Sequence, residues 1–313
     1  MSSNKEKLQL ADRHLREARI AEAVKLLPRH HFEKLSREER LLAANIARRT
    51  YNISLGLRLL HPLVFSEQTK PNEKEIAEYA VLLTLNGSFS EAKRLLHSIE
   101  SPKHPETLLA KVWCLFGVWE FREAIPVLHE YIKTQKDPYY KFAGRINLTE
   151  ALFETKNFES CHKELEKLNK DLAHTEFARL KANALHITSM LYHAQSKLKL
   201  SNQAIEKGLQ LFGATNTSDK LLLQRQSAIN MATKDKNPKA LQEFRKIAIK
   251  EKAWDSLRKI ELESLKINFE EKQFLNLYFG TPFIEFRKEL DRLFQKDRKS
   301  TRLNSSHTDI SRM

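Results

Sequence analysis

The chain has 313 residues, with 54 Lys and Arg against 40 Asp and Glu, a formal net charge of +14 and only 7 Gly. A soluble protein of this length carries ~22 Gly on average, so folds that need many tight turns, bulges or glycine-rich phosphate loops are excluded. Charged residues make up 30% and hydrophobic residues 41% of the chain, which indicates an ordered, helical protein.

Two cysteines, Cys114 and Cys161, are too few for a disulfide framework. Residues 1–15 are charged and lack the apolar core of a signal peptide. The chain also lacks the run of ~18 apolar residues that a transmembrane helix needs. We therefore expect a cytoplasmic protein with no membrane segment.

A short pattern recurs along the chain: an apolar residue, two spacers, a small residue and another apolar residue, followed three positions later by Leu. Phe121-Arg122-Glu123-Ala124-Ile125 with Leu128 is a clear copy. The small residues lie 33, 36, 32, 37, 43 and 36 positions apart, and the last two copies are weaker. This period predicts a repeated helical hairpin. The small residues are Ala23, Gly56, Ala92, Ala124, Cys161, Ala204 and Ala240.

An upstream helix precedes each copy, with apolar and small residues about 13, 12 and 9 positions before the small one, as in Ala43-Ala44-Ala47 and Tyr79-Ala80-Leu83. Small residues at these crossings let two helix backbones approach closely. One hairpin cannot bury its apolar face alone, so neighbouring hairpins must stack.

The segment Leu85-Asn86-Gly87-Ser88-Phe89-Ser90-Glu91-Ala92 resembles the tetratricopeptide repeat (TPR) family, whose unit of about 34 residues favours an aromatic just before a small residue. The resemblance covers roughly residues 5–250. It implies an all-α, right-handed superhelical solenoid of antiparallel helix pairs. We expect a TPR-like array over residues 1–250.

Residues 251–296 follow the array as capping or connecting helices. Glu251 to Leu265 has the broad apolar face of a helix. Gly280-Thr281-Pro282 then predicts a break, with Gly280 as a left-handed C-cap, before a last helix over Phe283 to Phe294. Because this short apolar helix needs a surface to pack on, we expect a truncated segment here.

The tail, residues 297–313, resembles a translated sequencing adapter. Asp297 to His307 reads DRKSTRLNSSH, and Ser311-Arg312-Met313 fits the next constant part of such an adapter. We therefore expect a non-native, disordered tail that interrupts the natural frame near Lys296. Without its 4 basic and 2 acidic residues the formal charge is +12 instead of +14, so the basic character belongs to the rest of the chain.

The sequence offers no catalytic constellation, so we expect neither an enzyme nor a cofactor or metal site. The phosphate-loop spacing G-x-x-x-x-G-K does not occur. Cys114 and Cys161 are far apart, and Cys161 fills a slot that requires a small packing residue. The pair His30-His31 lies between hairpins without a carboxylate at helical spacing, which is typical of a solvated linker.

The first helix of each hairpin should line the concave groove of the solenoid and carry the candidate partner-binding residues. Asn45 and Arg49, one helical turn apart, suit a peptide backbone or carboxylate. The equivalent positions of the first repeat are Asp12 and Arg16, so a full carboxylate clamp is not supported. Solvated charges are the plainer interpretation of Arg48 and Arg49. The groove candidates are Asn45, Arg48, Arg49, Asn147, Glu150, His193 and Lys197.

The net positive charge favours acidic partners or nucleic acid, but it is dispersed along the helices. The densest stretch runs from Lys234 to Lys259. It carries no recognisable helix-turn-helix, so nucleic acid is a less favoured partner than protein. The candidate anion- or nucleic-acid-binding face consists of Lys239, Arg245, Lys246 and Lys250.

Two functions from different classes follow. The favoured one is a non-catalytic scaffold or adaptor that binds a peptide or helix of a partner protein in its concave groove through several weak contacts. The alternative is the sensor or assembly arm of a transcriptional or signalling regulator whose C-terminal DNA-binding or output domain is missing.

Overall fold

The computed structural model describes residues 3–99, 102, 104–212, 218–251 and 253–310. The chain forms two compact units, Met1–Gln226 (unit 1) and Ser227–Met313 (unit 2), and all regular structure in the described ranges is helical. Unit 1 holds α1 (Asn4–Arg16), α2 (Ile20–Lys25), the short 3-10 helix η1 (Phe32–Lys34), α3 (Arg37–Arg49), α4 (Ile53–Val64), α5 (Glu73–Leu85), α6 (Phe89–His97), α7 (Pro105–Gly117), α8 (Phe121–Thr134), α9 (Pro138–Glu154), α10 (Phe158–Ala173), α11 (Ala178–Ala194) and α12 (Leu198–Gln210).

The boundary between the units lies inside α13 (Ser218–Asp235), and unit 2 continues with α14 (Lys239–Lys250), α15 (Trp254–Ile267), α16 (Glu271–Gly280) and α17 (Ile284–Ile310). The predicted array boundary at residue 250 coincides with the end of α14, whereas the compact units divide at Gln226. No described helix is long and apolar enough to cross a membrane.

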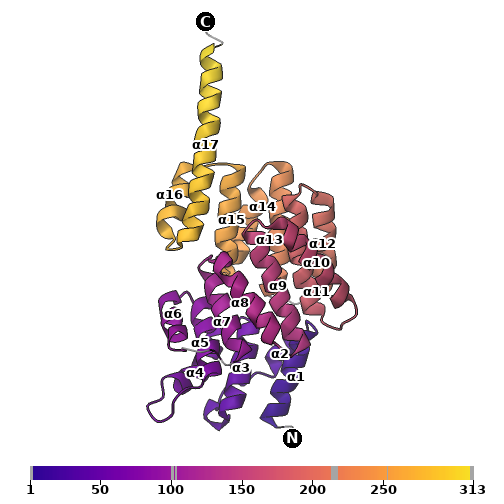
Figure 1. Ribbon diagram of the computed structural model, residues 1–313, viewed down its shortest axis with the longest axis vertical. Coiled ribbons are helices and arrows are strands. Elements are labelled where there is room, and N and C mark those ends of the chain that lie inside the picture. Colours follow the sequence, from indigo (N-terminus) through magenta and orange to yellow (C-terminus); the bar gives the residue numbers. More distant parts are fainter. Residues whose placement is uncertain (1–2, 100–101, 103, 213–217, 252, 311–313) are drawn as a thin grey trace. The chain divides into compact units, whose positions relative to one another are not determined.

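Consecutive helices of unit 1 pair into antiparallel hairpins, which we number 1 to 6 from α1–α2 to α11–α12 (Figure 1). Each hairpin turns through one residue with positive φ, and the amide of the next residue donates to the carbonyl five positions earlier, as Asn52 does to Ala47 at 2.8 Å. This bond closes the end of the first helix. The turn residues of hairpins 1 to 6 are Ala18, Tyr51, Gly87, Trp119, Lys156 and Ser196.

The predicted small residue lies five positions after the turn residue in hairpins 1 to 5. In hairpin 6 that position belongs to Ser201, not to Ala204 as the sequence pattern predicts. Ser201 Oγ donates to the carbonyl of Ser189, twelve positions earlier, just as Cys161 Sγ in hairpin 5 donates to the carbonyl of Thr149. The pattern shifts because Ser also satisfies the need for a small buried residue, and both Ser201 and Ala204 are buried.

Close helix crossings explain the small residues. A Cβ added at Gly56 in α4 would lie 2.7 Å from Leu82 Cδ2 in α5, so even a methyl group there would force Leu82 to move. In hairpins 2 to 5 the second helix contacts the first helix of the next hairpin, and in hairpin 1 helix α1 contacts α3, which gives a stack of neighbours. The predicted all-α, TPR-like solenoid of antiparallel helix pairs is confirmed.

Unit 2 contains the predicted break between its last two helices. Gly280 ends α16, but Gly87 is the one glycine with positive φ in the described ranges, so the predicted left-handed C-cap at Gly280 is wrong. The extended backbone of Thr281 caps α16 instead. Phe286 and Leu290 of α17 are fully buried. Helix α17 runs on to Ile310, so residue 297, where we expect a disordered tail to begin, does not coincide with a helix end.

Candidate partner-binding site

Two of the predicted groove residues join α3 to α5. Arg48 Nε donates to Glu78 Oε1 at 2.5 Å, and Asn45 Nδ2 donates to Glu78 Oε2 at 3.1 Å. The Arg48 side chain is only 14% exposed and Glu78 11%. Asn45 and Arg48 therefore act first as a hydrogen-bonded link between neighbouring hairpins.

The third residue, Arg49, connects α3 to helices much farther along the chain. Its guanidinium forms an ion pair with Asp12 of α1, and its Nη2 donates to Tyr139 Oη of α9 at 3.2 Å. Arg179 of α11 donates to the backbone carbonyl of Arg49 at 3.4 Å. With 8% of its side chain exposed, Arg49 offers little surface to a partner.

Arg16 of α1 lies beside the ion pair of Asp12 and Arg49, and its side chain is more exposed than that of Arg49. Its Nε donates to Asp12 Oδ2 at 2.9 Å, and its Nη2 donates to Asp137 Oδ2 at 3.2 Å. The guanidinium carbon lies 4.7 Å from the ring centroid of Tyr139 and 5.2 Å from that of Tyr140, within the range of cation–π attraction. A quarter of the Arg16 side chain is exposed. We call Asp12, Arg16, Arg49, Asp137 and Tyr139 the Arg–Tyr cluster.

The cluster balances two guanidinium groups with two carboxylates. Burial alone would raise the pKa of Asp12, but the positive charges of Arg49 and Arg16 outweigh it and hold that pKa below its ordinary value of 3.8. Burial opposes the charged form of Arg49, yet the neighbouring Tyr139, Tyr140 and Asp12 raise the pKa of Arg49 above its ordinary value. Both groups are therefore charged throughout the physiological pH range.

Sequence reasoning placed Asp12 and Arg16 at groove positions but did not pair them with Arg49. The i, i+4 spacing of Asp12 and Arg16 was the available signal. Asp137 and Tyr139 lie more than a hundred positions from α1, and no local pattern links them to it.

The remaining groove candidates lie in hairpins 5 and 6. Asn147 is buried and Glu150 half-buried in α9, His193 is half-buried near the end of α11, and Lys197 is exposed in the turn before α12. Arg49 reaches α9 in its first turn, at Tyr139, whereas Asn147 and Glu150 lie farther along that helix. A partner-binding role for these four residues stays a prediction.

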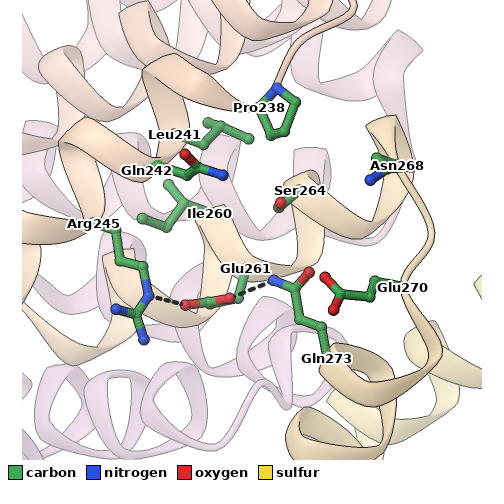
Figure 2. A pocket seen from close by; sticks show the side chains of 10 residues that line it. All are labelled: Pro238, Leu241, Gln242, Arg245, Ile260, Glu261, Ser264, Asn268, Glu270 and Gln273. Carbon is green, nitrogen blue, oxygen red and sulfur yellow. Dashed lines mark hydrogen bonds and ion pairs between the residues drawn. The ribbon is translucent and has the colours of Figure 1, made fainter.

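Unit 2 has a pocket of about 290 Å³ that α14, α15 and the start of α16 line (Figure 2). Arg245 Nε donates to Glu261 Oε1 at 2.5 Å, and Gln273 Nε2 donates to Glu261 Oε2 at 2.5 Å. Of the candidate anion-binding residues, Arg245 thus has its charge paired. Lys239, Lys246 and Lys250 are exposed on the same helix, and anion binding by this face stays a prediction.

Both cysteines carry protonated thiols at neutral pH. Burial raises the pKa of Cys114 to about 11 and that of Cys161 to about 12. Among the described residues, no group of three or more His, Cys, Asp or Glu side chains could hold a metal ion.

No protein-family model and no curated protein matches the chain. Among solved structures, the apo form of RapI is 10% identical, with 95% of this chain and 98% of that chain covered and a TM-score of 0.43. A putative kinesin light chain from Podosopora anserina, with nearly identical TPR-like repeats, is 18% identical, with 63% and 97% covered and a TM-score of 0.39. MamA MSR-1 C2 is 14% identical, with 56% and 93% covered and a TM-score of 0.40.

Proposed function

We propose that the protein is a non-catalytic, cytoplasmic scaffold that binds a peptide or helix of a partner protein along the first helices of unit 1. The observation that carries this proposal is the Arg–Tyr cluster, where hairpins 1, 2 and 5 bring charged and aromatic side chains to one place. Arg and Tyr are enriched at the energetic centres of protein interfaces because they combine apolar area with oriented hydrogen bonds.

The partial exposure of the Arg16 side chain supports the same proposal. Arg16 Nε donates to Asp12 Oδ2 on the same helix, so its guanidinium is oriented before a partner arrives and loses little conformational entropy on binding. The alternative function, an arm of a larger regulator, stays a prediction because it concerns sequence beyond this chain.

A charge-swap variant tests the proposal without touching the Arg–Tyr cluster. Glu150→Lys with Lys197→Glu reverses two predicted groove charges and leaves the net charge unchanged. The matched control, Glu166→Lys with Lys167→Glu, makes the same exchange on the exposed face of α10. Purified tagged chains are used to capture proteins from a cell extract, and the captured proteins are quantified by mass spectrometry.

We expect the groove variant to lose at least tenfold of a protein that the wild type and the control variant both retain, while circular dichroism shows the same helix content in all three. Equal capture by all three chains would overturn the proposed binding face. Reproducible turnover of a substrate by the purified chain would overturn its non-catalytic character.

A further inference from the structure

Unit 1 departs from a simple stack of neighbours where hairpins 1 and 2 meet hairpins 5 and 6. Helix α1 contacts α11, although four hairpins separate them in the sequence. Arg16 bonds to Asp137 at the start of α9, and Ala18 packs in an apolar cluster with Ala182, Ile205, Phe212 and Leu223. The array therefore turns back on itself, and hairpin 1 covers part of hairpins 5 and 6.

The contacts that hold neighbours together differ from those that close the array. Asp12 bonds to Arg16 on the same helix at 2.9 Å and forms a tight ion pair with Arg49 on the next hairpin. The bonds across the closure are longer: Arg16 to Asp137 at 3.2–3.5 Å, Arg49 to Tyr139 at 3.2 Å and Arg179 to the Arg49 carbonyl at 3.4 Å. Long hydrogen bonds are the weaker ones.

Exposure also marks the closing contact as the one that breaks most easily. The side chains of Arg16 and Asp137 are 25% and 37% exposed, so water and salt compete for both charges. Those of Asp12 and Arg49 are 17% and 8% exposed. To the apolar cluster at the closure, hairpin 1 contributes Ala18, whose methyl group buries little area.

Asp137 has a second role that survives opening. Its Oδ1 accepts a hydrogen bond from the Tyr139 amide at 2.8 Å and so caps the N-terminus of α9. When Arg16 leaves, this carboxylate keeps a partner and stays partly hydrated, and Arg16 keeps Asp12. Opening therefore leaves neither charge without a hydrogen bond.

We propose that hairpin 1 is a self-inhibitory latch that closes on hairpins 5 and 6 through Arg16 and Asp137 and opens to admit a partner segment. Hairpin 1 remains attached to hairpin 2 through Asp12 and Arg49 while the latch is open. The proposal rests on the proposed function for its consequence: only the open fraction binds, so the closed contact weakens the apparent affinity by that fraction.

The variant Asp137→Asn distinguishes the ion pair of Asp137 with Arg16 from its role as the N-cap of α9. Asn caps helices as well as Asp does, but it lacks the charge that attracts Arg16. Spin labels are placed at Lys7→Cys in α1 and Glu176→Cys before α11, both exposed, in a chain whose native cysteines are replaced by Ala. Double electron–electron resonance on the full chain then reports the distribution of distances between hairpins 1 and 6.

The matched control is Asp171→Asn, which removes an equal charge from the 2.6 Å pair with Arg145 inside hairpin 5. We expect Asp137→Asn to increase the population with the longer distance up to about fivefold, the factor that a partly exposed ion pair supports, and raised ionic strength to do the same in the wild type. Asp171→Asn should leave the distribution unchanged.

Identical distributions in all three chains, or equal changes in both variants, would overturn the latch. If Asp137→Asn unfolds the chain, the ionic-strength series on the wild type still tests the latch, and a distribution that does not change with salt would overturn it. Because the experiment contains no partner, its failure concerns the latch, whereas failure of the charge-swap capture concerns the proposed function.

Discussion

At the residue scale, Asp12 shows how one carboxylate can set the geometry of several helices. It accepts hydrogen bonds from Arg16 on its own helix and from Arg49 on α3. Arg49 in turn bonds to Tyr139 of α9. A buried ion pair contributes little net stability when both partners are present, but removal of one partner leaves an uncompensated buried charge.

This argument predicts a pH-dependent effect of Asp12→Asn. The folded-state pKa of Asp12 is lowered, so its contribution to stability is fully present above its ordinary pKa of 3.8 and is lost as the pH falls through the folded pKa. We expect the variant to lose about 3 kcal/mol of unfolding free energy at neutral pH and the deficit to shrink in acid. Denaturant unfolding from pH 7 to pH 2 measures both.

Glu123→Gln, at an exposed position of α8, is the control for this series, since it also removes one carboxylate charge from unit 1. Its stability should follow that of the wild type at every pH. A deficit of Asp12→Asn that stays constant down to pH 2 would contradict the assignment of the effect to the ionised carboxylate.

At the element scale, the hairpin turns carry a conformational free-energy cost that the sequence pattern does not reveal. Five of the six numbered hairpins place a residue other than glycine at positive φ in the turn, and hairpin 3 uses a glycine, Gly87, with φ 89°. A side chain at such a position costs roughly 1 kcal/mol because Cβ crowds the following carbonyl. The hydrogen bond to the carbonyl five positions back, repeated in each turn, holds these residues in place.

We therefore expect opposite effects from two exchanges at equivalent turns. Ser196→Gly should raise the unfolding free energy by about 0.5–1 kcal/mol, because relief of the crowding outweighs the added freedom of glycine in the unfolded chain. Gly87→Ala should lower it by about 1 kcal/mol, although open space surrounds the position. Chemical denaturation of both variants measures these changes in unfolding free energy. A loss of stability in Ser196→Gly would contradict the positive φ of Ser196 in the turn of hairpin 6.

The same turns show what a sequence pattern can and cannot predict. The return of a small residue predicted the hairpins because each crossing imposes a local size limit, and Ala92 and Ala124 obey it. The pattern predicted Ala204 because it requires a residue that is small and has an apolar neighbour. Ser201 is also small enough for the crossing, and its hydroxyl donates to the carbonyl of Ser189 in α11. Arg48 and Arg49 were expected on the first helices and lie there, but their partners were not predictable.

At the scale of the whole molecule, the closure of unit 1 depends on the sum of many small rotations between hairpins. Each hairpin is fixed by its neighbours through local crossings, so a period of about 34 residues is enough to predict the stack. Whether hairpin 1 reaches hairpin 5 depends on how these rotations accumulate. The pairing of Arg16 with Asp137 therefore belongs to three-dimensional structure alone.

The tail of α17 gives a final prediction at this scale. Upstream of residue 297, helix α17 is packed through apolar side chains: Phe286 and Leu290 are fully buried, and the ring of Phe294 stacks on Phe274 at a centroid distance of 5.0 Å. We expect deletion of residues 297–313 to leave the thermal midpoint within about 1 °C of the wild type, since these residues resemble a translated sequencing adapter and are not expected to belong to the natural fold. Deletion from Leu290 onward removes a fully buried leucine and the Phe294 ring, and it should lower the midpoint by several degrees. Differential scanning calorimetry compares the three chains; an equal drop in both deletions would mean that residues 297–313 are an integral part of the fold.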